Sequence, residues 1–173
     1  NYLCFALRRW KGFEEKAPLF GAAAEYAYRT YGLTPVFVAV EKHLDPGAGQ
    51  LAARGLTIPH YFLNDAGSAG TIIGALSRMQ AVVSMRLHAL IFAAGQGIPL
   101  AGVVYDPKVS AFLRYIGQDL FVDLADLTET DLRSMIDQCV AQAAHPETQE
   151  AAVRTLQAME HKNVEVARRL LKS

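Results

Sequence analysis

The sequence predicts an α/β domain built on a doubly wound, Rossmann-like parallel sheet. Three observations predict it: short apolar runs suited to buried strands recur along the chain, stretches with helical periodicity separate them, and glycines follow several of these stretches. Alternating strands and helices are typical of right-handed βαβ units, which place their strands in one parallel sheet. A glycine after a helical stretch readily takes the left-handed conformation that ends a helix.

Five apolar runs have the length and composition of buried strands. They lie at residues 2–7, 35–40, 60–63, 81–84 and 99–104. Helical patterns follow them at residues 17–31, 47–54, 68–78, 86–95 and 108–116. Pro18 falls in the first turn of the first predicted helix, where proline is tolerated, and the expected cap residues are Gly32, Gly55 and Gly117.

After Gly117 the pattern changes to a short apolar segment at residues 119–123 and helical runs at residues 128–144 and 146–171. Thr128 with an acidic residue three positions later is typical of a helix start. We expect residues 1–123 to form the core that carries the site, and residues 124–173 to form packing helices of the same domain. Residues 162–172 have a charged and an apolar face. We expect a solvated, structural role for them, and packing against another part of a longer protein is the alternative.

The charges balance, because 17 Lys and Arg residues face 17 Asp and Glu residues in a chain of 173 residues. This length and composition suit one compact domain. A neutral chain has no general attraction for nucleic acid or an anionic membrane surface, so any anion site must be local. We expect Cys4 and Cys139 to be buried free thiols in a reducing compartment, because they lie in separate apolar patterns.

No apolar run reaches the ~18 residues that span a bilayer, and no leader resembles a signal peptide. We therefore expect a cytoplasmic protein. The chain enters a strand-like stretch directly after Asn1, without an initiator methionine. From this we expect a domain cut from a longer protein.

Polar residues gather where the fourth and fifth predicted strands end. Carboxyl ends of parallel strands share one edge of the sheet, which is where open α/β sheets bind ligands. The residues are Ser84, Arg86 and His88 after the strand at 81–84, and Tyr105, Asp106 and Lys108 after the strand at 99–104.

Each of these groups suits an anionic ligand. Ser84 is placed to cap a helix that begins near Arg86, and a helix N-terminus attracts anions. Arg86 offers a fork of donors for a carboxylate or phosphate, and His88 can transfer protons near neutral pH. Each has a structural alternative: Arg86 could simply pair with a nearby acid, and His88 could be an ordinary packed histidine. Lys108 at the same edge adds a second cation and favours a binding site.

The first predicted strand is followed by Arg8, Arg9, Trp10 and Lys11 at the same edge, and we expect Arg8 and Arg9 to contact a ligand. Asn64, Asp65, Gly67 and Ser68 after the third strand suit either a phosphate contact or an ordinary helix cap. The sequence has no Gly-x-Gly-x-x-Gly fingerprint, P-loop or Gly-x-Ser-x-Gly elbow. It also has no cluster with metal-ligand spacing, so we expect no metal.

A longer motif joins these residues. It runs Ser84-x-Arg86-x-His88-Ala89-x-x-Phe92-Ala93-x-x-x-Gly97-Ile98-Pro99 and continues with Tyr105-Asp106-x-Lys108. It resembles the polysaccharide pyruvyl transferases of bacterial cell-wall and exopolysaccharide synthesis, especially the branch that modifies secondary cell-wall polymers for S-layer attachment. The resemblance extends from residue 2 to about residue 123. It implies two Rossmann-like halves in a GT-B-like arrangement with the site between them, of which this chain is the C-terminal half.

The resemblance implies transfer of a pyruvyl group from phosphoenolpyruvate to two hydroxyls of a sugar or lipid-linked saccharide, with release of phosphate. It makes His88, Lys108 and Arg86 the candidate catalytic residues, His88 for proton transfer and the two cations for the donor's charges. The candidate substrate-binding residues are Ser84, Arg8, Arg9, Tyr105 and Asp106. No cofactor beyond the donor substrate is implied.

The same resemblance implies that an N-terminal domain is needed for activity, so we expect this chain alone to turn over poorly. The lipid-linked acceptors of part of the family imply a place at the inner face of the membrane. Two other hypotheses about the function stay open. A nucleotide-sugar-dependent glycosyltransferase or epimerase of GT-B type would place Asp106 on a ribose, and a non-catalytic scaffold or sugar-binding module would need no catalytic residue.

Overall fold

The computed structural model confirms the predicted fold class. It describes residues 1–145, 147, 150, 153, 154, 156–158, 161, 162, 168 and 169. Its strands are β1 (Tyr2–Ala6), β2 (Thr34–Val38), β3 (Tyr61–Leu63), β4 (Ala81–Ser84), β5 (Leu100–Val104) and β6 (Phe121–Asp123). Its helices are α1 (Phe13–Tyr31), α2 (Pro46–Ala52), α3 (Ala69–Leu76), α4 (Leu87–Gly95), α5 (Pro107–Tyr115) and α6 (Glu129–Ala143).

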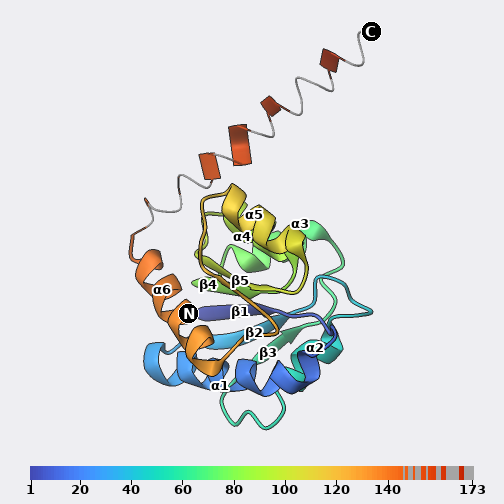
Figure 1. Ribbon diagram of the computed structural model, residues 1–173, viewed down its shortest axis with the longest axis vertical. Helices are drawn as coiled ribbons and strands as arrows, with labels where there is room; N and C mark the ends of the chain where they lie inside the picture. The colour runs from blue at the N-terminus through green and yellow to red at the C-terminus, as the bar shows by residue number, and fades with distance from the viewer. Residues whose placement is uncertain are drawn as a thin grey trace.

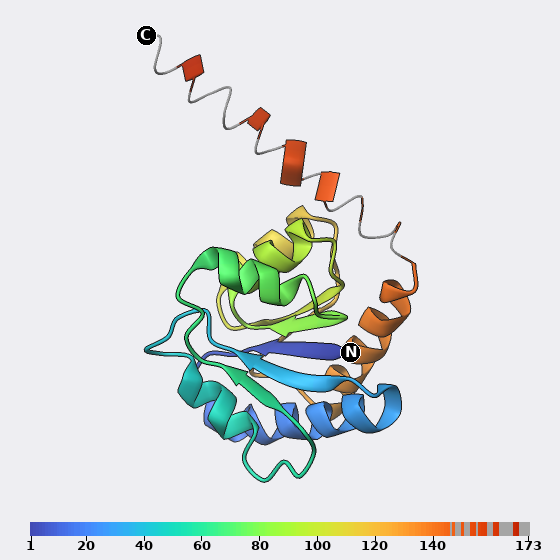
Figure 2. The ribbon, with the colours of Figure 1, turned by 180° about the vertical axis from the view of Figure 1, so that it is seen from behind.

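The strands form one six-stranded sheet in the order β3-β2-β1-β4-β5-β6, and every neighbouring pair is parallel. This is the order of a doubly wound dinucleotide-type fold. Helices α1, α2 and α6 cover one face of the sheet, and α3, α4 and α5 cover the other (Figures 1 and 2). The predicted Rossmann-like layer is therefore present.

Two apolar cores lie on the two faces of the sheet. Successive β1 residues alternate between them: Leu3 and Phe5 pack with the α1 side, whereas Cys4 and Ala6 pack with the α4 side. Alternating side chains that are buried on both faces are the pattern of a covered parallel sheet. Each large apolar side chain buried this way contributes roughly 1.5–3 kcal/mol.

Both cysteines are buried free thiols, as the sequence predicts. Burial raises the pKa of the Cys139 thiol to about 12 and also raises that of Cys4. Neither thiol ionises near neutral pH, so neither provides a nucleophile.

Helix α1 begins before the predicted boundary at residue 17, because the chain turns at Gly12. Gly12 has φ +81°, and the Phe13 N–H donates to the Trp10 carbonyl at 2.9 Å. Pro18 consequently lies inside the helix, so the placement in its first turn was wrong. The early start brings the buried side chain of Phe13 into the core and leaves Trp10 at the edge of the sheet.

The short apolar segment after Gly117 forms the sixth strand. Gly102 on β5 faces Phe121 on β6, and a Cβ at Gly102 would lie 2.3 Å from Leu113 Cδ1. The missing side chain lets Leu113 of α5 pack closely on β5, next to this edge strand. Helix α6 then begins at the predicted capping box of Thr128 and Asp131 and packs on α1, β4 and β5. Helix α6 thus contributes Leu132, Met135 and Ile136 to the core on the α1 side of the sheet.

Most of the predicted helical run 146–171 lies outside the described residues, and so does the amphipathic stretch 162–172 apart from residues 162, 168 and 169. Among the residues that are described, none of the helices is both long and apolar enough to cross a membrane.

Candidate functional site

The predicted site residues come from three adjacent strands. β1 lies next to β4, and β4 lies next to β5, so their carboxyl ends share one edge of the sheet. The chain winds away in opposite directions from β1 and β4, which makes the space between their carboxyl ends the topological switch point of the fold. Ligands of open α/β sheets bind in the crevice at such a point.

Arg86 is buried at the switch point and is paired with Asp45, which sequence reasoning missed. Its Nε lies 3.2 Å from Asp45 Oδ2 in an ion pair, and the two side chains are 11% and 1% exposed. The same Oδ2 accepts the backbone N–H groups of Val40 at 3.1 Å and Glu41 at 2.8 Å. The pair ties the loop after β2 to the turn after β4.

Two polar atoms of this pair, Asp45 Oδ1 and Arg86 Nη1, are buried without a hydrogen-bond partner in the structure. Burial raises the pKa of the Asp45 carboxyl above its ordinary value, whereas the two backbone N–H groups and Arg86 favour its ionised form. Arg86 is therefore paired with a nearby acid, which is the arrangement that the structural alternative to ligand binding describes.

Ser84 does not cap α4, so that expectation was wrong. The helix begins at Leu87, its N-cap residue is Arg86, and no side chain caps it. Ser84 is fully buried, and its Oγ accepts the Arg86 N–H at 2.8 Å while lying 3.2 Å from the Ala6 carbonyl and 3.0 Å from the Arg86 carbonyl. The hydroxyl thus makes its hydrogen bonds within the turn between β4 and α4, where it stabilises the position of Arg86.

His88 is exposed in the first turn of α4 and opens into a pocket of about 340 Å³. Phe92 packs beside it with ring centroids 6.2 Å apart. Loops after β2 and β3 form the opposite wall, which carries Glu41, Lys42 and Asp65. Within the described part of the chain no hydrogen bond or ion pair holds the imidazole, so it is open to a ligand.

Asp106 and Lys108 lie at the start of α5, where they bind each other. Asp106 caps the helix by accepting the Lys108 N–H at 3.0 Å, and its carboxylate lies 3.2 Å from Lys108 Nζ. The backbone N–H and the ammonium of Lys108, together with the charge of Arg8, hold the pKa of Asp106 below its ordinary value. Asp106 is thus ionised near neutral pH, and Lys108 is exposed beside it.

Arg8 is half-buried after β1 and lies over two aromatic rings. Its Cζ is 5.4 Å from the ring centre of Trp10 and 5.7 Å from that of Tyr105, and its Nη1 donates to the Tyr105 hydroxyl at 3.4 Å. The two rings lie 5.0 Å apart at a tilt of 53°. These contacts hold the guanidinium from one side.

The four predicted site cations therefore differ in their partners. Arg9 is exposed and pairs with Glu14, Lys108 pairs with Asp106, and Arg86 pairs with Asp45. Among the residues that the structure describes, Arg8 is the one of these four without a carboxylate at ion-pair distance. It is consequently the cation most available to an anionic ligand at the switch point.

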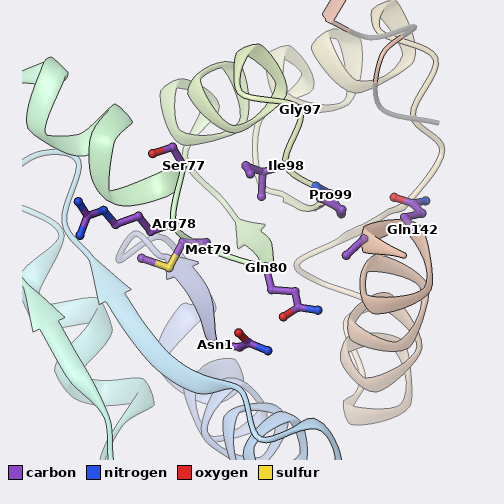
Figure 3. Close-up of a pocket in the computed structure, with 10 residues that line it drawn as sticks. Asn1, Ser77, Arg78, Met79, Gln80, Gly97, Ile98, Pro99 and Gln142 are labelled. Atoms are coloured by element: carbon purple, nitrogen blue, oxygen red, sulfur yellow. The ribbon is translucent and has the colours of Figure 1, made fainter. Parts of the chain in front are cut away.

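Two further pockets lie at opposite edges of the sheet. A pocket of about 720 Å³ opens at the carboxyl edge between the ends of β1, β5 and β6 and includes Trp10, Tyr105 and Asp106. A pocket of about 320 Å³ lies at the opposite edge, where Asn1, Gln80 and Pro99 precede β1, β4 and β5 (Figure 3). Because open α/β sheets bind ligands at the carboxyl edge, we place the site there and not in the pocket of Figure 3.

Asp45 escaped sequence reasoning because Asp45-Pro46-Gly47 has the pattern of an ordinary helix start. Nothing in the local sequence marks a carboxylate that pairs with an arginine in the turn after a distant strand. Trp10 was visible as an aromatic residue among cations, but only the Gly12 turn places it over the edge. In the described residues, no three His, Cys, Asp or Glu side chains gather as a metal site would require.

Comparison with known proteins decides the family. The sequence profile of a family described as polysaccharide pyruvyl transferase matches residues 4–107, which is more than half of the chain. The chain belongs to this family. The resemblance inferred from the Ser84 to Lys108 motif is therefore confirmed, and the matched region includes Arg8, Arg86 and His88. No curated protein sequence matches the chain.

Solved structures show the same fold at low sequence identity. The glycotransferase of kitacinnamycin is 16% identical with a TM-score of 0.60, and the match covers 91% of this chain and 40% of that one. The UDP-GlcNAc 2-epimerase from Neisseria meningitidis, bound to UDP-GlcNAc, is 13% identical with a TM-score of 0.57, and the match covers 95% and 44%. The chain thus spans less than half the length of these enzymes. The likeness confirms the predicted Rossmann-like fold.

Proposed function

We propose that this chain is the donor-side half of an enzyme that transfers the pyruvyl group of phosphoenolpyruvate to a sugar of a bacterial cell-wall or exopolysaccharide precursor. Membership of the polysaccharide pyruvyl transferase family is the observation that carries the proposal. The exposed imidazole of His88, beside the switch point of the sheet, supports it.

The proposed reaction forms a cyclic ketal. A proton adds to the methylene carbon of phosphoenolpyruvate, which becomes a methyl group, and C2 gains oxocarbenium character. Two sugar hydroxyls each form a C–O bond to C2 and lose a proton, while the bond from C2 to the phosphate oxygen breaks. Of the two protons lost, one balances the proton in the new methyl group and the other leaves with phosphate. No metal or cofactor enters this scheme.

His88 is the group that we assign to these proton transfers. A neutral imidazole accepts a proton from a hydroxyl, and an imidazolium donates one to the enol carbon. Among described residues its ring has no hydrogen bond to give up first, and Phe92 restricts it on one side.

Arg8 and Lys108 are the cations that we assign to the donor's carboxylate and phosphate. Arg8 needs no carboxylate to be displaced, and Lys108 is exposed. Arg86 receives a different role from the one expected from the sequence: we propose that the buried pair with Asp45 positions the turn that carries His88. Arg9 and Tyr105 border the same edge, and Tyr105 holds Arg8.

The other wall of the cleft would come from a domain outside this chain, which we propose supplies further acceptor contacts. A cytoplasmic enzyme working at the inner face of the membrane on lipid-linked saccharides, and a product that anchors an S-layer, belong to the same proposal. The glycosyltransferase alternative has support from the fold alone.

Phosphate release from phosphoenolpyruvate tests the proposal. The complete protein is assayed with an amino-sugar acceptor, alongside His88→Gln and the matched control His145→Gln, an exposed histidine beyond the end of α6. General acid–base catalysis is worth about 100-fold or more, so His88→Gln should lose at least that much while the control keeps its rate. Consumption of a UDP-sugar without phosphate release would replace the proposal with the glycosyltransferase alternative.

A further inference from the structure

The pocket of about 720 Å³ at the carboxyl edge has an aromatic wall and an acidic rim. Trp10 and Tyr105 form the aromatic wall, and Asp123 and Asp126 lie at the rim after β6. We call it the Trp10 pocket. None of the donor chemistry assigned above uses its tryptophan or its rim.

Trp10 is 48% exposed yet held in place. Arg8 lies over its ring, and Tyr105 packs against it at 5.0 Å. An exposed tryptophan leaves a large apolar surface in water, whereas one fixed by its neighbours can bind a ligand face with little further loss of freedom. The wall is therefore preorganised for a flat, partly apolar ligand.

The rim supplies acceptors for hydroxyl groups. Asp123 and Asp126 are exposed, and within the described residues their carboxylates make neither a hydrogen bond nor an ion pair. An ionised carboxylate accepts hydrogen bonds and donates none. A ligand with one flat C–H face and several hydroxyl donors would satisfy both the ring and the rim, and a pyranose has that form.

The charges at the rim of the pocket disfavour an anionic group there. Four carboxylates line the pocket, those of Glu15, Asp106, Asp123 and Asp126, together with the ammonium groups of Lys11 and Lys16. Lys108 pairs with Asp106, and Arg8 lies over the two rings of the wall, whereas the carboxylates at the rim have no ion-pair partner among the described residues. Lys16 already donates to the Leu127 carbonyl at 2.9 Å. A phosphate group placed at the rim would be repelled by the carboxylates of Asp123 and Asp126, whereas a neutral or amino-bearing sugar would not.

We infer that the Trp10 pocket binds a saccharide ring, stacked on Trp10 and hydrogen-bonded to Asp123 and Asp126. The identification of this saccharide ring as part of the acceptor rests on the proposed function. The ring would be a sugar of the acceptor chain next to the one that receives the pyruvyl group, so this domain would contribute to acceptor choice as well as to donor binding.

Fluorescence tests binding directly, because Trp10 is the single tryptophan of the sequence. The chain of 173 residues is titrated with N,N′-diacetylchitobiose, N-acetylmannosamine and galactose, and separately with UDP and phosphoenolpyruvate. We expect a saturable change in Trp10 emission with at least one saccharide. A response to UDP at lower concentration than to every saccharide would overturn the inference in favour of a nucleotide.

Saturation-transfer NMR on variants assigns the contact to this pocket. Trp10→Ala and the double variant Asp123→Asn with Asp126→Asn should each weaken saccharide binding about tenfold or more, as expected when a stacked ring or a charged acceptor is lost. Tyr61→Ala, which removes a 56% exposed tyrosine from β3, is the matched control and should bind normally. Circular dichroism of each variant confirms that it is folded. Unchanged binding in folded Trp10→Ala overturns the inference.

The two proposals fail separately. Saccharide binding without phosphate release by the complete protein would leave the Trp10 pocket valid and remove the pyruvyl transfer. If the complete protein releases phosphate, and Trp10→Phe and Trp10→Ala leave its KM for the acceptor unchanged, the pyruvyl transfer would stand and the saccharide site in the Trp10 pocket would be ruled out.

Discussion

Two arginines follow adjacent strands at the switch point, and their surroundings differ completely. Arg86, after β4, is buried against Asp45, whose Oδ2 lies 3.2 Å from its Nε. Arg8, after β1, is half-buried over the rings of Trp10 and Tyr105 and has no carboxylate at ion-pair distance among the described residues. One is held by charge inside the protein and the other by aromatic faces at its surface.

The difference shows that residues at the carboxyl edge of one parallel sheet can have either structural or ligand-binding surroundings. The loop after β2 folds over the turn after β4 and provides a carboxylate, so Arg86 becomes part of the scaffold. The turn after β1 bends at Gly12 toward the end of β5, where it meets Tyr105 instead. The same residue type therefore contributes to folding on one strand and is available for a ligand on the next.

Removing the carboxylate of Asp45 should have the largest effect on stability. Asp45→Ala leaves the Arg86 guanidinium buried without its counter-charge, which costs about 3 kcal/mol or more in the free energy of unfolding. Urea denaturation followed by circular dichroism measures the loss. Asp65→Ala, which removes an exposed carboxylate paired with Lys42, should cost under about 1 kcal/mol. Equal losses in both variants would contradict the structural role of the Asp45 pair.

This pair also marks what the sequence could predict. The strands, most helices, the buried thiols and the shared edge follow from periodicity and from the rule that parallel strands end together. The partner of Arg86 does not, because it depends on how the loop after β2 folds in three dimensions. The prediction that Ser84 caps the helix failed for a similar reason. Its place in the sequence suits a cap, but the three-dimensional path of the turn brings its hydroxyl to the Arg86 backbone.

The sequence also could not predict that His88 and Lys108 have different surroundings. Both follow strand ends at one edge, yet His88 opens toward the loops after β2 and β3, whereas Lys108 binds Asp106 at the start of α5. Sequence spacing places residues on an edge but does not give the direction in which each side chain points. That direction decides whether two groups can touch one ligand without a rearrangement.

Replacing Arg8 should affect the donor more than the fold. In the complete protein, Arg8→Met should raise the KM for phosphoenolpyruvate about tenfold, because a charge-assisted contact is worth roughly 1.5–3 kcal/mol. Its stability should fall by under about 1 kcal/mol, the value of exposed cation–π contacts. Arg29→Met, at an exposed arginine paired with Glu25, is the matched control. Steady-state kinetics over a range of phosphoenolpyruvate concentrations measures the KM, and a change in kcat alone would contradict this assignment.

The smallest effect should appear in the titration of Asp106. The backbone N–H of Lys108, its ammonium and the charge of Arg8 lower the pKa of this carboxyl in the folded chain. A lowered pKa means that the stabilisation is fully present above the unfolded value, about 3.9, and is lost as the pH falls through the folded value. Lys108→Met should raise the midpoint part of the way, since the backbone contact remains.

Arg8→Met should raise the midpoint of Asp106 by less, because Arg8 acts on it only through space, and Arg29→Met should leave it unchanged. Carboxyl chemical shifts followed by NMR from neutral to acidic pH measure these midpoints. A shift from Arg8→Met as large as that from Lys108→Met would mean that Arg8 approaches Asp106 more closely than Tyr105 and Trp10 allow it to. The surface arginine would then be an ion-paired residue like Arg86, and the contrast between the two strand ends would disappear.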